Sequence, residues 1–210
     1  MENAQIEVAK RLLAIDTIKI QPNIPFTWAS GWKSPIYCDN RKVLSFPDTR
    51  TFICSQFVKL IKEKYPNAEA IAGVATGAIA HGVLVAEVLQ LPFIYVRSKP
   101  KGHGLENLIE GDIQPGTKVV IIEDLISTGG SSISAAEAIR NFGCEVLGML
   151  AIFTYNFPLA AQNFEDANIE LTTLSNYNIL LKLAYDSGEI TDSQLESLNN
   201  WRKSPETWGK

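Results

Sequence analysis

From Pro47 onward, apolar residues change repeatedly between helical and strand-like spacing. Over 48–64 they recur every three or four positions, which predicts an amphipathic helix. Short continuous apolar runs predict strands buried on both faces, and they fall at 70–74, 93–96, 118–123 and 146–153. Helices are expected between these strands. Such alternation predicts an α/β fold, in which right-handed crossovers build a parallel sheet flanked by helices.

The segments on either side of this alternating region follow a different pattern. Residues 4–14 have helical spacing, whereas prolines interrupt the strand-like pieces between 18 and 46. This second stretch predicts a small, irregular N-terminal hood at one end of the sheet. A long loop is expected over 97–116. We interpret 1–210 as a single domain, made of a hood (about 1–46), an α/β core (about 47–186) and a C-terminal helix (about 187–210).

Composition narrows the classes of function. The chain is 46% hydrophobic with a formal net charge of −4, which argues against general nucleic-acid binding. No apolar stretch approaches the roughly 20 residues of a membrane span, and the polar start MENAQIEVAK is unlike a signal peptide. The scattered cysteines Cys38, Cys54 and Cys144 are typical of free thiols in a cytoplasmic protein. A cytoplasmic location with neither membrane nor nucleic-acid partners is therefore expected.

The most informative segment is VVIIEDLISTGGS at 119–131. Its apolar run leads into two acids, Glu123 and Asp124, at the end of a predicted strand, where open α/β sheets place ligands. A small polar run then opens a helix, and such a turn can cradle a phosphate with backbone N–H groups. Acids for sugar hydroxyls beside a phosphate cradle indicate a phosphorylated ribose. The alternatives are a purely structural strand–turn–helix and a Walker loop, which lacks its lysine here.

The same segment resembles the phosphoribosyl pyrophosphate (PRPP) signature of type I phosphoribosyltransferases. The resemblance implies that family's fold, a parallel sheet flanked by helices with a small N-terminal hood. Together with the basic string at 97–104, which resembles a loop of the same family, it also implies catalytic roles for Lys101, His103, Asp124 and Glu123. The PRPP-binding residues that the two segments imply are Arg97, Lys101, His103, Glu123, Asp124, Leu125, Ile126, Ser127, Thr128, Gly129, Gly130 and Ser131.

A basic string, RSKPKGHG at 97–104, lies in the predicted long loop. Loops of this length in compact domains are usually functional lids or disordered, and its cations suit a diphosphate. The alternative is a solvated basic loop without a role. The string resembles the catalytic loop of orotate phosphoribosyltransferases, which implies a homodimer whose subunits lend this loop to each other. Ser98 departs from the second lysine of many members, so one pyrophosphate contact is missing or comes from Lys99.

A second string, FTWASGWKSPIYCDNR at 26–41, resembles the F-T-x-x-S-G-x-K-S-P-x-Y segment of the same family. Its aromatics can stack on a planar base, and Lys33 and Arg41 can meet the charge of orotate. The resemblance implies that orotate is bound by Ser127, Lys33 and Tyr37. Ala29 departs from members that carry a lysine there. The alternative for each aromatic is that it only packs the hood.

A third match, GVATGAIA at 73–80, resembles the family's pyrophosphate loop, with Ala75, Thr76 and Gly77 at its centre. Small residues let the backbone approach a pyrophosphate closely. Family members often hold a non-proline cis peptide here. The alternative is a simple strand-to-helix turn. His81, one turn into the following helix, is expected to pack rather than to catalyse.

Together these motifs favour an orotate phosphoribosyltransferase, which makes orotidine 5′-monophosphate and pyrophosphate from orotate and PRPP in pyrimidine biosynthesis. The resemblance implies Mg²⁺ as cofactor, held mainly through PRPP with no direct protein ligand. A purine phosphoribosyltransferase shares the PRPP signature but does not explain strings 26–41 and 97–104 together. A non-catalytic PRPP-sensing regulator predicts a DNA-binding helical module. A ribose-phosphate synthetase-like subunit predicts a longer, duplicated chain.

Overall fold

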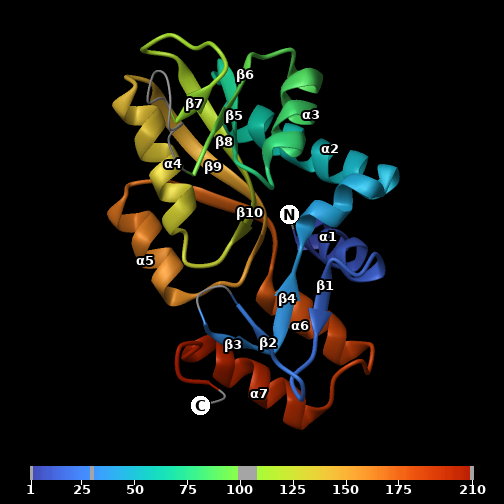
Figure 1. Ribbon diagram of the computed structural model, residues 1–210. Helices are drawn as coiled ribbons and strands as arrows, with labels where there is room; N and C mark the ends of the chain where they lie inside the picture. The colour runs from blue at the N-terminus through green and yellow to red at the C-terminus, as the bar shows by residue number, and fades with distance from the viewer. Residues whose placement is uncertain (1, 29–30, 99–107, 209–210) are drawn as a thin grey trace.

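The computed structural model describes residues 2–28, 31–98 and 108–208, and its centre is a six-stranded sheet (Figure 1). The strand order is β10 (Leu171–Asn176), β9 (Glu145–Thr154), β8 (Lys118–Ile126), β5 (Ala70–Val74), β6 (Phe93–Val96) and β7 (Ile109–Glu110). All neighbours pair in parallel except β6 and β7, which are antiparallel. The predicted fold class, a mostly parallel sheet flanked by helices, is confirmed.

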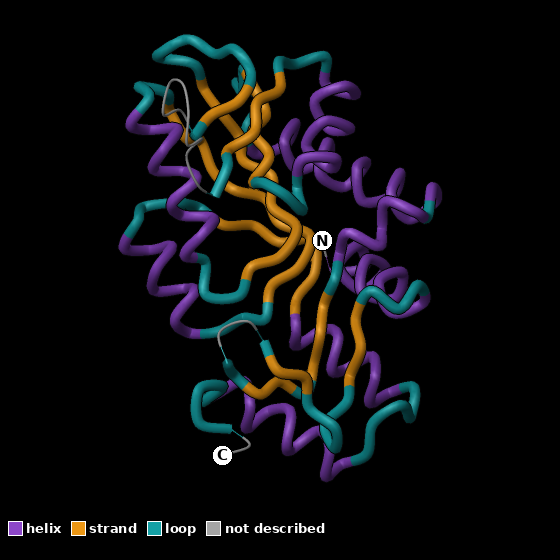
Figure 2. The backbone as a smooth tube through the Cα atoms, in the orientation of Figure 1, coloured by secondary structure: helices purple, strands orange, loops and turns teal. Residues whose placement is uncertain are grey.

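Helices cover both faces of this sheet (Figures 1 and 2). On one side lie α1 (Glu2–Ala14), α2 (Pro47–Lys64) and α3 (Ile79–Leu89), and on the other lie α4 (Gly130–Asn141) and α5 (Pro158–Asp166). Central strand residues such as Ile71, Ile121 and Leu150 are fully buried between the two layers. Burial on both faces explains why these strands are continuous apolar runs.

The hood is built from short antiparallel pairs next to the last helices of the chain (Figure 1). β1 (Ile18–Ile20) pairs with β4 (Ile36–Cys38), β2 (Phe26–Thr27) pairs with β3 (Lys33–Ser34), and a 3₁₀ helix η1 (Asn40–Ser45) leads into α2. At the same end lie α6 (Tyr177–Asp186) and α7 (Asp192–Lys203). This arrangement places the first and last parts of the chain together beside one end of the sheet.

Two strands differ from the sequence-based expectation. β10 was not among the strands expected from the sequence, and the loop expected over 97–116 contains β7. β10 has the polar sequence LTTLSN and lies at an edge of the sheet, so it lacks the continuous apolar run of a central strand. β7 has only two residues, which is too short for a periodic pattern. Along the described ranges, no helix is long and apolar enough to cross a membrane.

The strand order reverses between β5 and β8. The chain adds β6 on one side of β5 and β9 on the far side of β8. Open α/β sheets bind ligands at such a switch point, beyond the carboxyl ends of the strands. The pairing of β8 with β5 ends at Ile122, whereas its pairing with β9 continues to Ile126. The two acids, Glu123 and Asp124, therefore lie where the sheet opens beside β5.

Candidate active site

A cleft of about 420 Å³ lies at this switch point. It is bounded by the loop after β5, the end of β8, the start of α4 and the hood. Its described lining is Cys38, Asp39, Arg41, Val74, Ala75, Thr76, Gly77, Glu123, Asp124, Leu125 and Ser131. The structure thus brings residues of three of the four motif segments, at 26–41, 73–80 and 119–131, into one cavity.

Glu123 is a buried carboxylate with specific partners. Its side chain is 4% exposed, and it accepts hydrogen bonds from Ser132 Oγ at 2.7 Å and from the Asp124 backbone N–H at 2.9 Å. Burial, followed by repulsion from Asp124, raises the pKa of Glu123 well above its usual range. Ser132 was not among the predicted site residues, although the serine pair at the start of α4 is a signal that could have suggested it.

Asp124 contacts Asn40 through its backbone and the 75–77 loop through its side chain. Burial raises the pKa of its carboxyl group. Its carbonyl oxygen accepts a hydrogen bond of 2.6 Å from Asn40 Nδ2, and Asn40 is itself fully buried. A Cβ at Gly77 would overlap the Asp124 carboxylate, so glycine is required for the 75–77 loop to lie this close. The Ala75–Thr76 bond in this loop is cis, as in the family that the loop resembles.

The small polar run after β8, at 127–131, packs against α5. Gly129 has a φ of +84°, and a Cβ there would meet the ring of Phe164. Asn163 Nδ2 donates to the Thr128 carbonyl oxygen at 2.9 Å. The turn therefore carries its exposed N–H groups at the start of α4, the geometry that suits an anion. Neither supporting residue was predicted, because no local pattern links α5 to this turn.

Not every predicted PRPP contact faces the cleft. Leu125 and Ser131 line it, whereas Ser127, Thr128, Gly129 and Gly130 lie beside it in the turn. The side chain of Ile126 is fully buried, and its carbonyl oxygen accepts a hydrogen bond from the Tyr155 backbone N–H. The side chain of Ile126 therefore belongs to the core rather than to the cleft lining, and the role of Ile126 in PRPP binding stays a prediction.

On the hood side, the cation in the cleft is Arg41. It donates to both carboxylate oxygens of Asp39, at 2.6 and 3.0 Å, and this pairing holds the pKa of Asp39 below its usual value. Lys33 and Tyr37 are outside the described cleft lining. Lys33 Nζ donates to Thr27 Oγ1 at 2.9 Å, and the Tyr37 ring lies against Phe26. Cys38 and Asp39 also line the cleft and were not singled out from the sequence.

The segments on either side of the predicted basic loop form a short hairpin stem. β6 and β7 pair antiparallel, and the Arg97 backbone N–H donates to the Leu108 carbonyl oxygen at 2.8 Å. Arg97 Nη1 lies 3.2 Å from Glu110 Oε1, so its charge is engaged at the stem. Lys101 and His103, both predicted to be catalytic, lie outside the described residues.

The other histidine, His81, is 2% exposed on α3. Burial lowers its pKa to about 4, so it is neutral at physiological pH. The prediction that His81 packs rather than catalyses agrees with this placement, since it is absent from the described cleft lining.

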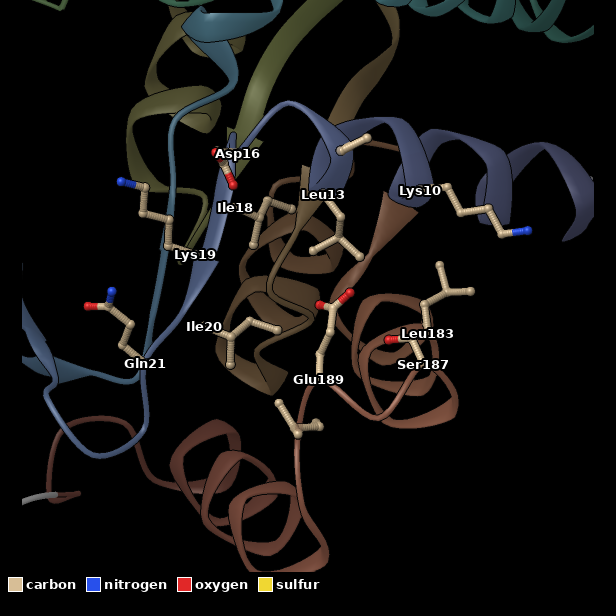
Figure 3. A pocket seen from close by; sticks show the side chains of 12 residues that line it. Lys10, Leu13, Asp16, Ile18, Lys19, Ile20, Gln21, Leu183, Ser187 and Glu189 are labelled. Atoms are coloured by element: carbon tan, nitrogen blue, oxygen red, sulfur yellow. The ribbon is translucent and has the colours of Figure 1, made fainter.

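A larger cleft, of about 750 Å³, lies elsewhere on the hood between α1, β1 and the segment after α6 (Figure 3). Its lining mixes apolar residues, such as Ile18, Leu183 and Ile190, with polar ones, such as Asp16 and Glu189. Figure 3 shows the amino groups of Lys10 and Lys19 pointing away from the cavity. The two clefts share no described lining residue, and only the smaller one contains the buried acid pair. Size alone therefore does not identify the reactive site.

Comparison with known proteins agrees with this geometry. Residues 53–169 match the family described as the phosphoribosyl transferase domain. The orotate phosphoribosyltransferase of Porphyromonas gingivalis is 61% identical over 202 residues, covering 96% of each chain. The crystal structure of orotate phosphoribosyltransferase from Aeropyrum pernix superposes with a TM-score of 0.75 at 27% identity, covering 85% of this chain and 98% of that one.

A third similar structure is Leishmania donovani UMP synthase, with a TM-score of 0.79 and 26% identity. The match covers 95% of this chain but only 42% of that longer one. The family match spans more than half of the chain, and the identity to the curated relative extends over nearly all of it. This chain, with its acid pair at the switch point and its hood over the cleft, belongs to the orotate phosphoribosyltransferase family.

Proposed function

We propose that this chain transfers the 5-phosphoribosyl group of PRPP to orotate, giving orotidine 5′-monophosphate and pyrophosphate. In this reaction the bond from the ribose anomeric carbon to the pyrophosphate oxygen breaks, and a bond to a ring nitrogen of orotate forms. The observation that carries the proposal is the juxtaposition, in one cleft, of the Glu123–Asp124 pair, the 75–77 loop and the hood residue Arg41. Family membership supports the choice of orotate as the base.

The acid pair would act on the ribose. Asp124 lines the cleft and would accept hydrogen bonds from the ribose hydroxyls, and its negative charge would stabilise positive charge that develops at the anomeric carbon. Glu123 accepts from the Asp124 backbone and from Ser132, so its contribution includes holding Asp124 in position. No covalent nucleophile is required, because a ribosyl cation can be stabilised by electrostatics alone.

The two phosphate groups would occupy opposite ends of the cleft. The turn at 127–131 offers backbone N–H groups at the start of α4 and would hold the 5′-phosphate. The 75–77 loop lies against Asp124 and would hold the pyrophosphate through its backbone. The ribose would then span the acids between them.

Orotate would enter from the hood. Arg41 is the described cation of the cleft and suits a carboxylate, which a guanidinium can bind through two hydrogen bonds. Asp39 already occupies this guanidinium, so binding orotate would require Arg41 to share it or to reorient. Ser127, Lys33 and Tyr37 remain our candidates for further contacts, in a closed arrangement of the hood.

We propose that Mg²⁺ binds together with PRPP and neutralises part of its diphosphate charge. Magnesium prefers oxygen ligands and usually retains several waters, so the hydroxyl and diphosphate oxygens of PRPP suit it. Among the described residues, no group of three or more His, Cys, Asp or Glu side chains is arranged to hold a metal ion. The cleft carboxylates Asp39 and Asp124 fit a metal that takes most of its ligands from the substrate.

We also propose a homodimer in which the basic loop acts on the neighbouring subunit. The loop would close over the pyrophosphate with Arg97, Lys101 and His103 and exclude water from the activated sugar. The support is that Arg97 pairs with Glu110 at the stem and is outside the described lining of its own cleft. A cytoplasmic location is proposed as well, because Cys38, Cys54 and Cys144 are all free.

Subunit mixing tests the shared loop. Lys101→Ala chains and Asp124→Asn chains are each expected to be inactive alone. In a mixed dimer, loop exchange combines an intact loop with an intact acid at one of the two sites, so activity returns. If the loop served its own subunit, every site would keep one defect and mixing would restore nothing. Mixing wild-type chains with each variant controls for exchange.

The proposed reaction is tested by following orotate ultraviolet absorbance with purified protein, PRPP and Mg²⁺, alongside adenine, xanthine, hypoxanthine and uracil. Turnover of orotate alone is expected. Turnover of a purine would preserve the PRPP site and overturn the base assignment. PRPP binding without turnover of any base would overturn the enzyme assignment and favour a sensor. Omitting Mg²⁺ is expected to abolish turnover, which an added chelator would confirm.

A further inference from the structure

The C-terminal helix α7 contacts the hood through one fully buried tryptophan. Trp201 Nε1 donates a hydrogen bond of 3.1 Å to the carbonyl oxygen of Lys33, which lies 168 residues earlier on β3. Figure 1 shows α7 next to β3 at the hood end of the molecule. The β2–β3 pair consists of only two residues in each strand. A two-stranded ribbon of this kind is marginally stable in water, so its position depends on what it packs against.

Aromatic rings continue this contact into the core. We define the aromatic cage as Trp28, Tyr155, Phe157 and Trp201. The Trp201 ring centroid lies 5.2 Å from that of Phe157, 5.7 Å from Trp28 and 5.8 Å from Tyr155. Trp28 follows β2 directly, and Tyr155 follows β9. The cage therefore joins the hood hairpin to the carboxyl end of the sheet.

The next residue of α7 anchors the other side of the cage. Arg202 Nη1 donates to the Asn156 carbonyl oxygen at 3.0 Å, in the turn after β9. Tyr155, in the same turn, donates its backbone N–H to the carbonyl oxygen of Ile126, at the end of the PRPP strand β8. Adjacent residues of one helix thus hold the hood hairpin and the turn beside the PRPP strand at a set separation.

We infer that α7, through Trp201 and Arg202, is a positioning element for the base-binding side of the site. It sets where the β2–β3 hairpin stands relative to the acids of β8, without touching either substrate. The inference rests on the proposed function, because it assigns the hood to orotate. It predicts that loosening α7 weakens the use of orotate and leaves the use of PRPP unchanged, a difference that simple destabilisation would not produce.

The test is Trp201→Phe, which keeps an aromatic ring in the cage. It removes the indole N–H that donates a hydrogen bond to the Lys33 carbonyl oxygen. We expect the KM for orotate to rise by about three- to tenfold, the range for losing one hydrogen bond, with little change in the KM for PRPP. Tyr65→Phe is the matched control. It removes the hydrogen bond that the Tyr65 hydroxyl donates to Glu170 Oε2 at 3.0 Å, beyond the end of α2 and away from α7, and should leave both KM values unchanged.

Three results would overturn the inference: an unchanged KM for orotate in Trp201→Phe, an equal rise in both KM values, or the same orotate effect in Tyr65→Phe. If Trp201→Phe does not fold, Arg202→Gln carries the test, with a smaller rise in the KM for orotate expected and an unchanged value contradicting it. The wild type is assayed first. Failure of the wild type to use orotate would refute the proposed function itself. If the wild type is active and neither Trp201→Phe nor Arg202→Gln changes the KM for orotate, only the role of α7 is refuted.

Discussion

The two sides of the cleft are held in different ways. On the ribose-phosphate side, Glu123 is fixed by Ser132 and by the backbone of Asp124, both within nine residues along the chain. On the base side, the short hairpin that carries Lys33 is fixed by Trp201, 168 residues away. With the proposed roles, chemistry on the ribose would depend on one continuous strand–turn–helix, and recognition of the base would depend on the packing of distant segments. Variants on one side of the cleft should therefore affect the use of PRPP, and variants on the other side should affect the use of orotate.

The largest effect is expected from Asp124→Asn. The amide keeps the shape of the side chain but removes the charge beside the anomeric carbon, so kcat/KM should fall about 10²- to 10³-fold. Steady-state kinetics with PRPP as the varied substrate measures this loss. Asp166→Asn, at an exposed acid on α5, should match the wild type. If Asp124→Asn keeps the kcat/KM of the wild type, the Asp124 charge does not stabilise the reacting ribose.

Gly77→Ala should come next. The added methyl group would overlap the Asp124 carboxylate, so the loop or the acid must move. Displacements on this scale at a reacting centre lower kcat/KM by about 10- to 100-fold. The KM for PRPP should rise while the circular dichroism spectrum stays that of the folded chain. Equal effects on both substrates would indicate that the two sides are not separable at this point.

A smaller effect, on stability, is expected at Glu123. Burial makes this carboxyl hold its proton to higher pH in the folded chain than in the unfolded one, so the free energy of unfolding falls as pH rises above about 4.3. Glu123→Gln removes the ionisation of this group, so the gain in the free energy of unfolding should be larger at pH 8 than at pH 4.

Urea unfolding at the two pH values measures this difference, and PRPP use should fall in the same variant. Asp124, whose pKa is also raised by burial, should leave a weaker slope of the same sign in Glu123→Gln. A gain of equal size at both pH values would mean that packing, rather than ionisation, limits the stability of this side.

The smallest effect is expected at Asn163, which supports the phosphate turn. Asn163→Ala loses the hydrogen bond to the Thr128 carbonyl oxygen, so the KM for PRPP should rise about three- to tenfold and that for orotate should not. Gln162→Ala, at the exposed neighbouring position, is the control. Asn163→Ala should therefore raise only the KM for PRPP, whereas Trp201→Phe should raise only the KM for orotate. If either variant raised both KM values, the two sides of the cleft would not be held independently.

Much of the sheet could be predicted because its strands are buried on both faces. The runs at 70–74 and 93–96 have the observed limits of β5 and β6. β10 was missed because an edge strand with threonines lacks that pattern, and β7 because two residues are too few to show one. Pairing with a neighbouring strand, rather than local composition, makes these segments strands.

The candidate site divides along the same line. Residues proposed to present charge or backbone to a ligand, such as Asp124 and Gly77, stand in recognisable motifs. Supporting residues such as Asn163 and Trp201 have no local signature, because their partners are 35 and 168 positions away. The roles of Lys101 and His103 remain predictions from the sequence.

By itself, the sequence determined the order of the central strands and the helices between them, the acid pair, the small polar turn and the family that these motifs resemble. Each depends on residues within one or two elements, where periodicity, charge and glycine content act locally. Only the tertiary structure decided that Arg41 enters the cleft, that Ile126 belongs to the core and that α7 reaches the hood hairpin. These outcomes depend on the packing of segments that are distant along the chain, and such packing follows from the whole folded arrangement.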